Sequence, residues 1–252
     1  MNPNLDLSKA KYHDIVNENY DYAVLPWGAT EPHNYHLPYM TDCYLAYHIS
    51  IDAVEKAFSD NEIKGMVLPY VPFGAQNPGQ LDYPFCLHTS YQTQFSILRD
   101  IVASLDRQGI NKLFIVNGHG GNSFKSMIRD LAVDYPDFII ILIDWFAVEP
   151  QEPYFDIKDD HAGEQETSVL MYYRPDLVDL SVAGEGKRIP FKSASLNAGV
   201  GWTPRNWKRV SPDTGTANPK KSSAEKGERY AKAVVAKIAK LFAEVVKDGI
   251  YQ

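Results

Sequence analysis

Four short apolar runs stand out along the chain. They cover residues 22–28 (YAVLPWG), 65–74 (GMVLPYVPFG), 112–118 (KLFIVNG) and 138–146 (FIIILIDWF). Hydrophobic positions in these runs are continuous rather than alternating, which is typical of strands that are covered on both faces. The runs therefore predict four buried strands of a parallel sheet.

Helical patterns alternate with these runs. One begins at Asp42, with Thr41 as a candidate N-cap, and another covers residues 91–108 and ends before Gly109, a common helix stop. Further helices are expected from about Asn122, from about Gly163 and over roughly residues 222–247. Strand–helix alternation of this kind predicts an α/β protein, a three-layer α/β/α fold with a mostly parallel central sheet.

Residues 182–220 differ from the rest of the chain. They are rich in Gly, Ser, Pro, Asn and Thr and hold few aliphatic residues. A long segment without regular structure is usually a lid over a site, a contact between subunits or a mobile loop. The sequence has no internal repeat, so we expect residues 1–252 to form a single domain that contains this loop-rich insertion.

Charge and composition exclude several classes of protein. The net charge of −7 over 252 residues disfavours nucleic acid as the main partner. No apolar run approaches the roughly 20 residues that span a bilayer, and no signal peptide is visible, so we expect a cytoplasmic protein. Cys43 and Cys86 form no CxxC pair and are expected to be free thiols.

The first candidate site follows the run that ends at Gly28. Glu31, His33, His36 and Asp42 lie within 12 residues, at the carboxyl end of a predicted parallel strand, where open α/β sheets bind ligands. Each residue alone has an ordinary explanation, such as a charge at a helix start. Together, two carboxylates and two imidazoles match the ligands that Zn, Mn or Fe take in proteins. The cluster favours a metal site.

Two further segments carry polar groups at similar places. Residues 114–124 (FIVNGHGGNSF) run from a predicted strand through His119, Gly120 and Gly121 into a helix. Glycines permit close approach of the backbone to a ligand, although a turn histidine bonded to the backbone is an equal alternative for His119. Residues 159–173 (DDHAGEQETSVLMYY) hold His161 and Glu166. A Glu in the first helical turn is also stabilised by the helix dipole alone.

With these three segments in view, the chain resembles the creatininase (creatinine amidohydrolase) family. That family has a G-S/A-T-E-Q-H-G-x-H-L-P-x-x-T-D pattern, matched here by GATEPHNYHLPYMTD at residues 28–42. Its N-G-H-G-G-N segment is intact at residues 117–122, and its H-A-G-x-x-E-T-S segment is present as HAGEQETS at residues 161–168. The resemblance spans roughly residues 20–175 and implies an α/β/α fold, two metals per subunit and a hexameric homo-oligomer.

The resemblance also implies roles for individual residues. Glu31, Asp42 and His119 would bind one metal, with Zn the first expectation and Mn or Fe as alternatives. His33 and Asp42 would bind the second metal, with Asp42 bridging the two. Creatinine-hydrolysing members add a Glu two residues after the NGH histidine, where this chain has Gly121, so Glu166 is the acid available to complete the second site. His36 is expected to support these ligands rather than to bind metal.

Other departures argue against creatinine as the substrate. Creatinine enzymes have a tryptophan shortly before the HAG histidine, where Lys158 and Asp159 stand here. Residues 73–80 (FGAQNPGQ) also depart from a serine-containing pattern of the family. Other branches hydrolyse a formamide of a pyrimidine nucleotide precursor, a peptide from redox-cofactor maturation, or a keto-inositol ring.

The expected function is metal-assisted hydrolysis of a non-peptide C–N bond, in a cyclic amide or formamide of a small molecule. His161 would donate a proton to the leaving nitrogen, and Glu166 would either shuttle that proton or complete the second metal site. Gly120, Gly121 and Asp159 are expected to contact the substrate. Two alternatives stay open: opening of a keto-inositol or sugar-like ring, and a metal-binding member of the family that has lost catalysis.

Overall fold

A four-stranded sheet with all strands parallel forms the centre of the molecule. The computed structural model describes residues 4–158 and 161–251. The strands lie in the order β2-β1-β3-β4, and their bounds are Tyr22–Trp27 (β1), Gly65–Val67 (β2), Lys112–Asn117 (β3) and Ile139–Asp144 (β4). The predicted parallel sheet is therefore confirmed.

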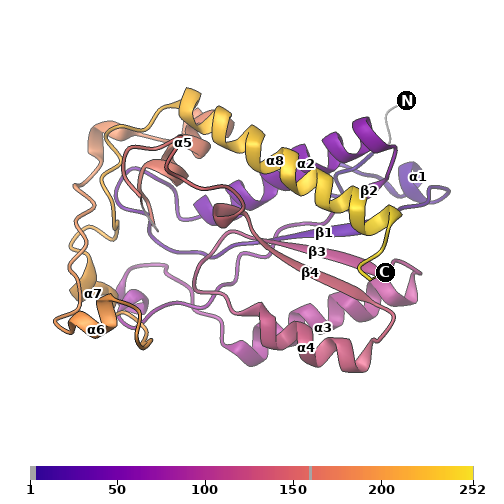
Figure 1. The fold of residues 1–252 in the computed structure, drawn as a ribbon, viewed down its shortest axis with the longest axis horizontal. Coiled ribbons are helices and arrows are strands. Elements are labelled where there is room, and N and C mark those ends of the chain that lie inside the picture. The colour runs from indigo at the N-terminus through magenta and orange to yellow at the C-terminus, as the bar shows by residue number, and fades with distance from the viewer. Residues whose placement is uncertain (1–3, 159–160, 252) are drawn as a thin grey trace.

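Helices cover both faces of the sheet, as Figure 1 shows. On one face lie α2 (Thr41–Asn61), α5 (Glu164–Tyr173) and α8 (Ala224–Lys247), and on the other lie α3 (Tyr91–Arg107) and α4 (Phe124–Asp134). Shorter helices are α1 (Tyr12–Ile15), α6 (Ala194–Asn197) and α7 (Trp207–Val210), and four 3₁₀ turns are η1 (Gln80–Asp82), η2 (Trp145–Ala147), η3 (Pro175–Leu177) and η4 (Leu180–Val182). The three-layer α/β/α prediction is confirmed.

Alternate residues of β1 enter different cores. Tyr22 and Val24 pack in the core shared with α2, α5 and α8, whereas Ala23, Leu25 and Trp27 pack in the core shared with α3 and α4. Because successive side chains of a strand point to opposite faces, a central strand needs apolar residues at every position. The continuous hydrophobic run of the sequence therefore follows from burial on both sides.

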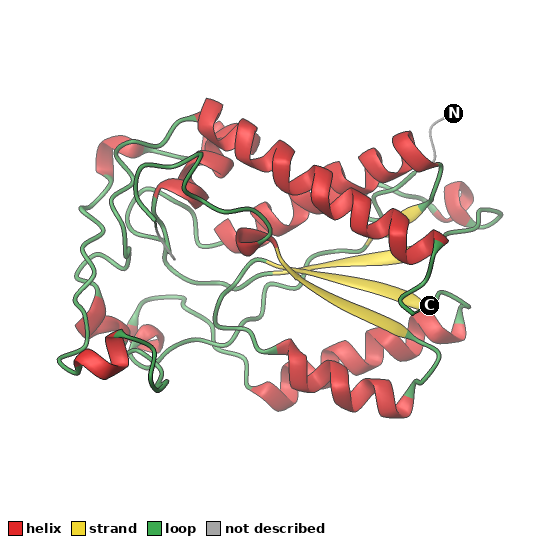
Figure 2. Ribbon diagram, viewed as in Figure 1, coloured by secondary structure: helices red, strands yellow, loops and turns green. Residues whose placement is uncertain are grey.

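The strand order reverses beside β1. The chain passes from β1 through α2 to β2 on one side, and then through α3, on the opposite face, to β3 on the other side. The loops that follow β1 and β3 consequently part from each other and leave a crevice, which is the usual ligand site of open α/β sheets. Figure 2 shows the long loops gathered beyond this carboxyl end of the sheet.

Three local predictions need correction. The second strand has three residues instead of ten. Leu68 still donates to the Val24 oxygen at 2.8 Å, but the chain then passes through Pro69 and meets β1 again only where Val71 bridges Trp27. Thr41 is not the N-cap of α2, since it is the first helical residue and its hydroxyl donates to the Pro38 carbonyl at 2.7 Å. The segment 182–220 is not wholly irregular, since it contains α6 and α7.

Other expectations hold. Gly109 follows α3 with a left-handed φ of 79°, as expected of a helix stop. Cys43 and Cys86 are both buried free thiols. Within residues 4–158 and 161–251, none of the helices combines the length and apolar character needed to cross a bilayer. The single-domain expectation stays a prediction.

A glycine near the start of α8 sets how closely this helix approaches α5. A Cβ added to Gly227 would lie 1.9 Å from the main-chain oxygen of Ser168. Alanine normally favours a helix over glycine by about 1 kcal/mol. Here we expect Gly227→Ala to lower the free energy of unfolding, by roughly 1–3 kcal/mol, because the two helices must separate.

Urea denaturation of Gly227→Ala and of Glu225→Ala, an exposed position in the same turn, measures this effect. The Glu225→Ala control is expected to stay within about 0.5 kcal/mol of the wild type. A Gly227→Ala protein more stable than the wild type would contradict the packing argument.

Candidate metal centre

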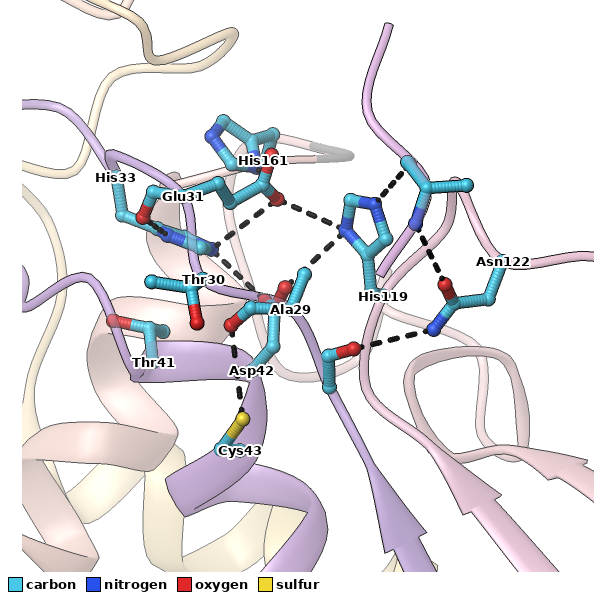
Figure 3. Close-up of polar contacts among 12 residues, drawn as sticks. Ala29, Thr30, Glu31, His33, Thr41, Asp42, Cys43, His119, Asn122 and His161 are labelled. Carbon is cyan, nitrogen blue, oxygen red and sulfur yellow. Dashed lines mark hydrogen bonds and ion pairs between the residues drawn. The ribbon is translucent and has the colours of Figure 1, made fainter. Parts of the chain in front are cut away.

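Six polar side chains from separate segments meet at the carboxyl end of the sheet. Figure 3 shows the side chains of four of them, Glu31, His33, Asp42 and His119, pointing toward one another, with His161 beside Glu31. They come from the loop after β1, the first turn of α2, the turn after β3 and the segment that leads into α5. The sixth side chain, Glu166, belongs to the first turn of α5. All six side chains are buried.

One group consists of Glu31, Asp42 and His119. The Nδ1 atom of His119 lies 2.9 Å from Glu31 Oε1 and 3.2 Å from Asp42 Oδ2. One nitrogen or oxygen from each of the three residues falls within 4.8 Å of the others, which is close enough for a single cation to contact all three.

A second group shares Asp42 with the first and adds His33 and Glu166. Here the other carboxylate oxygen of Asp42, Oδ1, lies 2.9 Å from His33 Nε2. Glu166 Oε2 lies 3.9 Å from the same nitrogen and accepts the Ala162 N–H at 2.6 Å. Because the two oxygens of Asp42 face different groups, this carboxylate can bridge two cations.

His161 gives a third, overlapping group with Glu31 and His33. Its Nδ1 lies 3.6 Å from Glu31 Oε1, and its ring centre lies 4.3 Å from that of His33. The His161 ring therefore lies beside the two groups that share Asp42 and belongs to neither of them.

Main-chain carbonyls orient all three imidazoles. His33 Nδ1 lies 3.1 Å from the Glu31 oxygen, His119 Nε2 lies 2.8 Å from the Ala75 oxygen, and His161 Nε2 lies 3.1 Å from the Pro32 oxygen. A carbonyl only accepts, so each of these nitrogens must donate. In the neutral ring the opposite nitrogen then presents its lone pair to the carboxylates, which is the arrangement of histidines that ligate metals.

The pKa shifts in the cluster show that its carboxylates favour positive charge at the histidines. Burial by itself lowers the pKa of His33, but the carboxylate of Asp42 and two further acids outweigh it and raise that pKa to about 10. Burial is likewise outweighed at His119, whose pKa is raised well above its ordinary value by Glu31 and Asp42. The pKa of Asp42 is lowered despite burial, because the charges of His33 and His119 favour its ionised form.

The residues present fit divalent metals. Within the described part of the chain, Asp42 Oδ2 is buried and makes no hydrogen bond. An unsatisfied buried carboxylate oxygen is costly unless a cation or a donor neutralises it. Nitrogen and carboxylate ligands of this kind suit Zn, Mn or Fe.

His161 has a different electrostatic environment from the other two histidines. Burial and the positive charge of His33 lower its pKa to about 4, although Glu31 acts in the opposite direction. The edge of its ring meets Trp207 at 5.1 Å between ring centres. Burial and the charge of His33 thus both favour the neutral form of His161.

Asparagines of the NGHGGN segment hold the surrounding loops together. Asn122 donates to the Gly28 oxygen at 3.3 Å and accepts the Ala75 N–H at 3.1 Å. Asn117 accepts the His119 N–H at 3.1 Å. These bonds join the loops after β1, β2 and β3, and so they position the Ala75 carbonyl that orients the His119 ring.

His36 and Glu164, by contrast, lie outside the three groups. His36 is buried and its Nε2 lies 2.8 Å from the Thr167 hydroxyl, next to Glu166, which fits its expected supporting place. Glu164 pairs with Lys226 of α8 and accepts the Asp156 N–H at 2.8 Å. Its carboxylate anchors α8 and the segment before His161.

A cavity of about 540 Å³ opens over the cluster. Gly120 and Gly121 line it, and their contact with a substrate stays a prediction, whereas Asp159 lies outside the described residues. Its other walls come from residues that the sequence analysis did not single out, and these include Gln80, Gln151, Gln165, Arg205 and Trp207.

Two of these unexpected residues contact the site directly. The Gln80 amide donates to Glu31 Oε2, and Trp207 packs on His161. Neither belongs to a motif with a known spacing. The segment WTPRNW at residues 202–207 holds two tryptophans and an arginine within an otherwise polar loop. This composition was the sequence feature that could have indicated Trp207 as a site residue.

Gly121 explains why a glutamate is absent after the NGH histidine. A Cβ there would lie 2.3 Å from the Ala75 oxygen and 2.4 Å from His119 Nε2. Any larger residue would displace the carbonyl that orients His119. The acid near His33 and Asp42 is Glu166 of α5, whose role as a replacement ligand stays a prediction.

Comparisons with known proteins agree with this picture. The sequence model of the creatininase family, described as creatinine amidohydrolase, matches residues 6–242. A creatinine amidohydrolase of Pseudomonas putida is 27% identical over 177 residues, which are 62% of this chain and 66% of that enzyme. The mycofactocin precursor peptide peptidase of Mycobacterium ulcerans is 26% identical over 241 residues, which are 90% of this chain and 82% of that protein.

Solved structures share the fold. A Bacteroides fragilis protein with a provisional assignment as creatinine amidohydrolase is 54% identical, with a TM-score of 0.98 over 100% of both chains. A creatininase structure with manganese is 22% identical, with a TM-score of 0.77 over 97% of this chain and 99% of that chain. The family match and the Bacteroides structure together show that the chain belongs to the creatininase family.

Proposed function

We propose that this creatininase-family hydrolase is a metal-dependent amidohydrolase that cleaves a non-peptide C–N bond, in a cyclic amide or a formamide. The observation that carries the proposal is the pair of ligand groups that share Asp42 at the base of one cavity. Each of three imidazoles donates to a carbonyl through one nitrogen and turns its other nitrogen toward buried carboxylates. A cation between these nitrogens and carboxylates would be bound by both.

The proposed ligands follow the two groups. Glu31, Asp42 and His119 would hold one metal, and His33, Asp42 and Glu166 would hold the other, with Asp42 common to both groups. Zinc is the first choice, with manganese or iron as alternatives, and solved relatives with manganese and with two zinc ions support this set. Glu166 thus completes the second site, in place of the proton shuttle considered from sequence.

When bound, two divalent cations lower the pKa of a water molecule and polarise the carbonyl group of the substrate. His161 moves the proton. Its Nε2 atom holds the Pro32 carbonyl at 3.1 Å and fixes the ring, so Nδ1 faces Glu31 and the cluster. Nδ1 carries the lone pair of the neutral ring, and there His161 is proposed to accept a proton from the attacking water. It then returns this proton to the leaving nitrogen.

The remaining groups orient the substrate. The main-chain N–H groups of Gly120 and Gly121 are proposed to bind the carbonyl oxygen as its negative charge develops. Trp207 covers one edge of His161 and shields it from water. Gln80 holds Glu31 through a hydrogen bond, and so keeps that carboxylate turned toward His119.

Peptide hydrolysis is the second candidate. It is favoured by the match to the Mycobacterium ulcerans peptidase over 90% of this chain. The ring-opening and inactive alternatives of the sequence analysis have no comparable support. A screen of metal-loaded protein against cyclic amides, formamides, short peptides and cyclic polyol ketones separates all four.

Assembly into a homo-oligomer, hexameric by family resemblance, is also proposed. Val200 and Trp202 are 81% and 86% exposed in the loop-rich segment, where a neighbouring subunit would cover them. Size-exclusion chromatography with light scattering measures this directly.

Metal content distinguishes the bridging residue from the others. We expect Asp42→Asn to lose both metals after dialysis, because this substitution weakens both sites. Glu166→Gln should retain about one metal per subunit. The metal affinity of the other site should fall by more than the roughly 10–100-fold lost when a residue that only hydrogen-bonds to a ligand is mutated. Elemental analysis by plasma mass spectrometry counts the bound metal.

The matched control is Asp52→Asn, a carboxylate of the same helix that accepts the Tyr173 hydroxyl at 2.8 Å away from the centre. It should retain two metals. Full metal content in Asp42→Asn would contradict the assignment.

Proton transfer is tested at His161. The substitution His161→Asn is expected to keep both metals and to lower kcat by about 10²–10⁴-fold, the usual contribution of general acid–base catalysis. Steady-state kinetics on the best substrate of the screen, together with metal analysis, checks both statements. Loss of one metal from His161→Asn would instead make this residue a ligand.

A further inference from the structure

One stretch of the loop-rich segment has an unusual charge. Residues 186–212 contain six Lys and Arg residues and no Asp or Glu, in a chain whose net charge is −7. The six are Lys187, Arg188, Lys192, Arg205, Lys208 and Arg209. An excess of one sign over 27 residues of an acidic protein suggests a negatively charged partner.

The fold gathers four of these cations around a second cavity of about 460 Å³. Its walls are Arg188, Lys192, Arg205 and Arg209 together with Ile189, Pro190, Phe191, Pro204, Asn206 and Val210. The Ile189 N–H donates to the Val210 oxygen at 2.7 Å and brings the two halves of the wall together. Among the residues that the structure describes, no acidic side chain lines this cavity.

This cationic cavity adjoins the cavity over the proposed metals. Pro204 and Arg205 line both. The guanidinium carbon of Arg205 lies 4.7 Å from the ring centre of Trp207, whose ring in turn contacts His161 at 5.1 Å. The two cavities therefore meet at Pro204 and Arg205, beside the tryptophan that contacts His161.

The cations of this cavity differ from ordinary surface charges. Lys192 and Arg209 have no carboxylate partner within residues 4–158 and 161–251, whereas the neighbouring Lys208 faces away and pairs with Asp82 at 3.0 Å. Cations such as Lys192 and Arg209, in a recess with apolar walls, raise the local concentration of anions. Arginine side chains also bind carboxylate and phosphate groups in a bidentate manner.

We propose that Arg188, Lys192, Arg205 and Arg209 form an anion-binding subsite, and that the substrate carries a carboxylate or phosphate group next to the bond that is hydrolysed. This inference rests on the proposed amidohydrolase function and names its substrate class. The neutral amide lies over the metals while the anionic group lies in the cationic cavity.

Binding of three formamides tests this proposal. The probes are N-formylglycine, N-formyl-O-phosphoethanolamine and the neutral N-formylethanolamine, titrated calorimetrically into the metal-loaded protein. We expect one anionic probe or both to bind about tenfold or more tightly than the neutral one, the equivalent of one charge-assisted hydrogen bond. The tighter of the two anions identifies the group as carboxylate or phosphate.

A pair of double variants separates the cavity from overall charge. Lys192→Gln/Arg209→Gln removes two cations from the cavity and should reduce the preference for the anion to within about threefold. Lys187→Gln/Lys208→Gln removes the same charge from the same segment outside the cavity, and should keep the full preference. Thermal denaturation confirms that both proteins are folded.

Titration of Asp42→Asn keeps this proposal distinct from the metal assignment. A preference for the anion that persists in Asp42→Asn locates the anionic group away from the metals. A failed metal assignment appears only in the metal content, and it leaves this binding result unaffected. Equal binding of anionic and neutral probes by the wild type, or equal loss of the preference in both double variants, would overturn the subsite.

Discussion

Hydrogen bonds from three imidazoles to main-chain carbonyls are the constraint on which the rest of this site depends. His33, His119 and His161 each use one ring nitrogen in this way. With the rings fixed in this way, their other nitrogens face the carboxylates of Glu31 and Asp42. A cation would offset the cost of burying such groups, and this is the physical basis of the proposed metal centre.

The fold supplies those carbonyls from its loops. Reversal of strand order between β1 and β3 opens a crevice, and α2 begins beside it with Asp42 in its first turn. Asn122 then ties the loops after three strands to one another, and Gly121 leaves room for the Ala75 carbonyl. A side chain at position 121 would meet the Ala75 carbonyl, and Glu166 of α5 is the acid that we propose completes the second metal site.

Much of the fold and part of the candidate site could be predicted from the sequence, for reasons that differ between elements. Continuous apolar runs identify β1, β3 and β4 because a central parallel strand is buried on both faces. The second run also contains a strand, β2, but only over three residues, because the prolines at 69 and 72 follow it. Motif order brings Glu31, Asp42 and His119 to one place, but no local pattern indicates that Gln80 or Trp207 will reach them. Such contacts arise from long loops, whose paths depend on tertiary packing.

The central claim is that two metals share Asp42. Anomalous diffraction from crystals of the zinc-loaded protein tests it most directly. The account predicts two peaks per subunit, with one oxygen of Asp42 about 2.0–2.2 Å from each and with Glu166 on the metal bound by His33. A single peak ligated by Glu31, His33 and His161, or two peaks without a bridging Asp42, would contradict it.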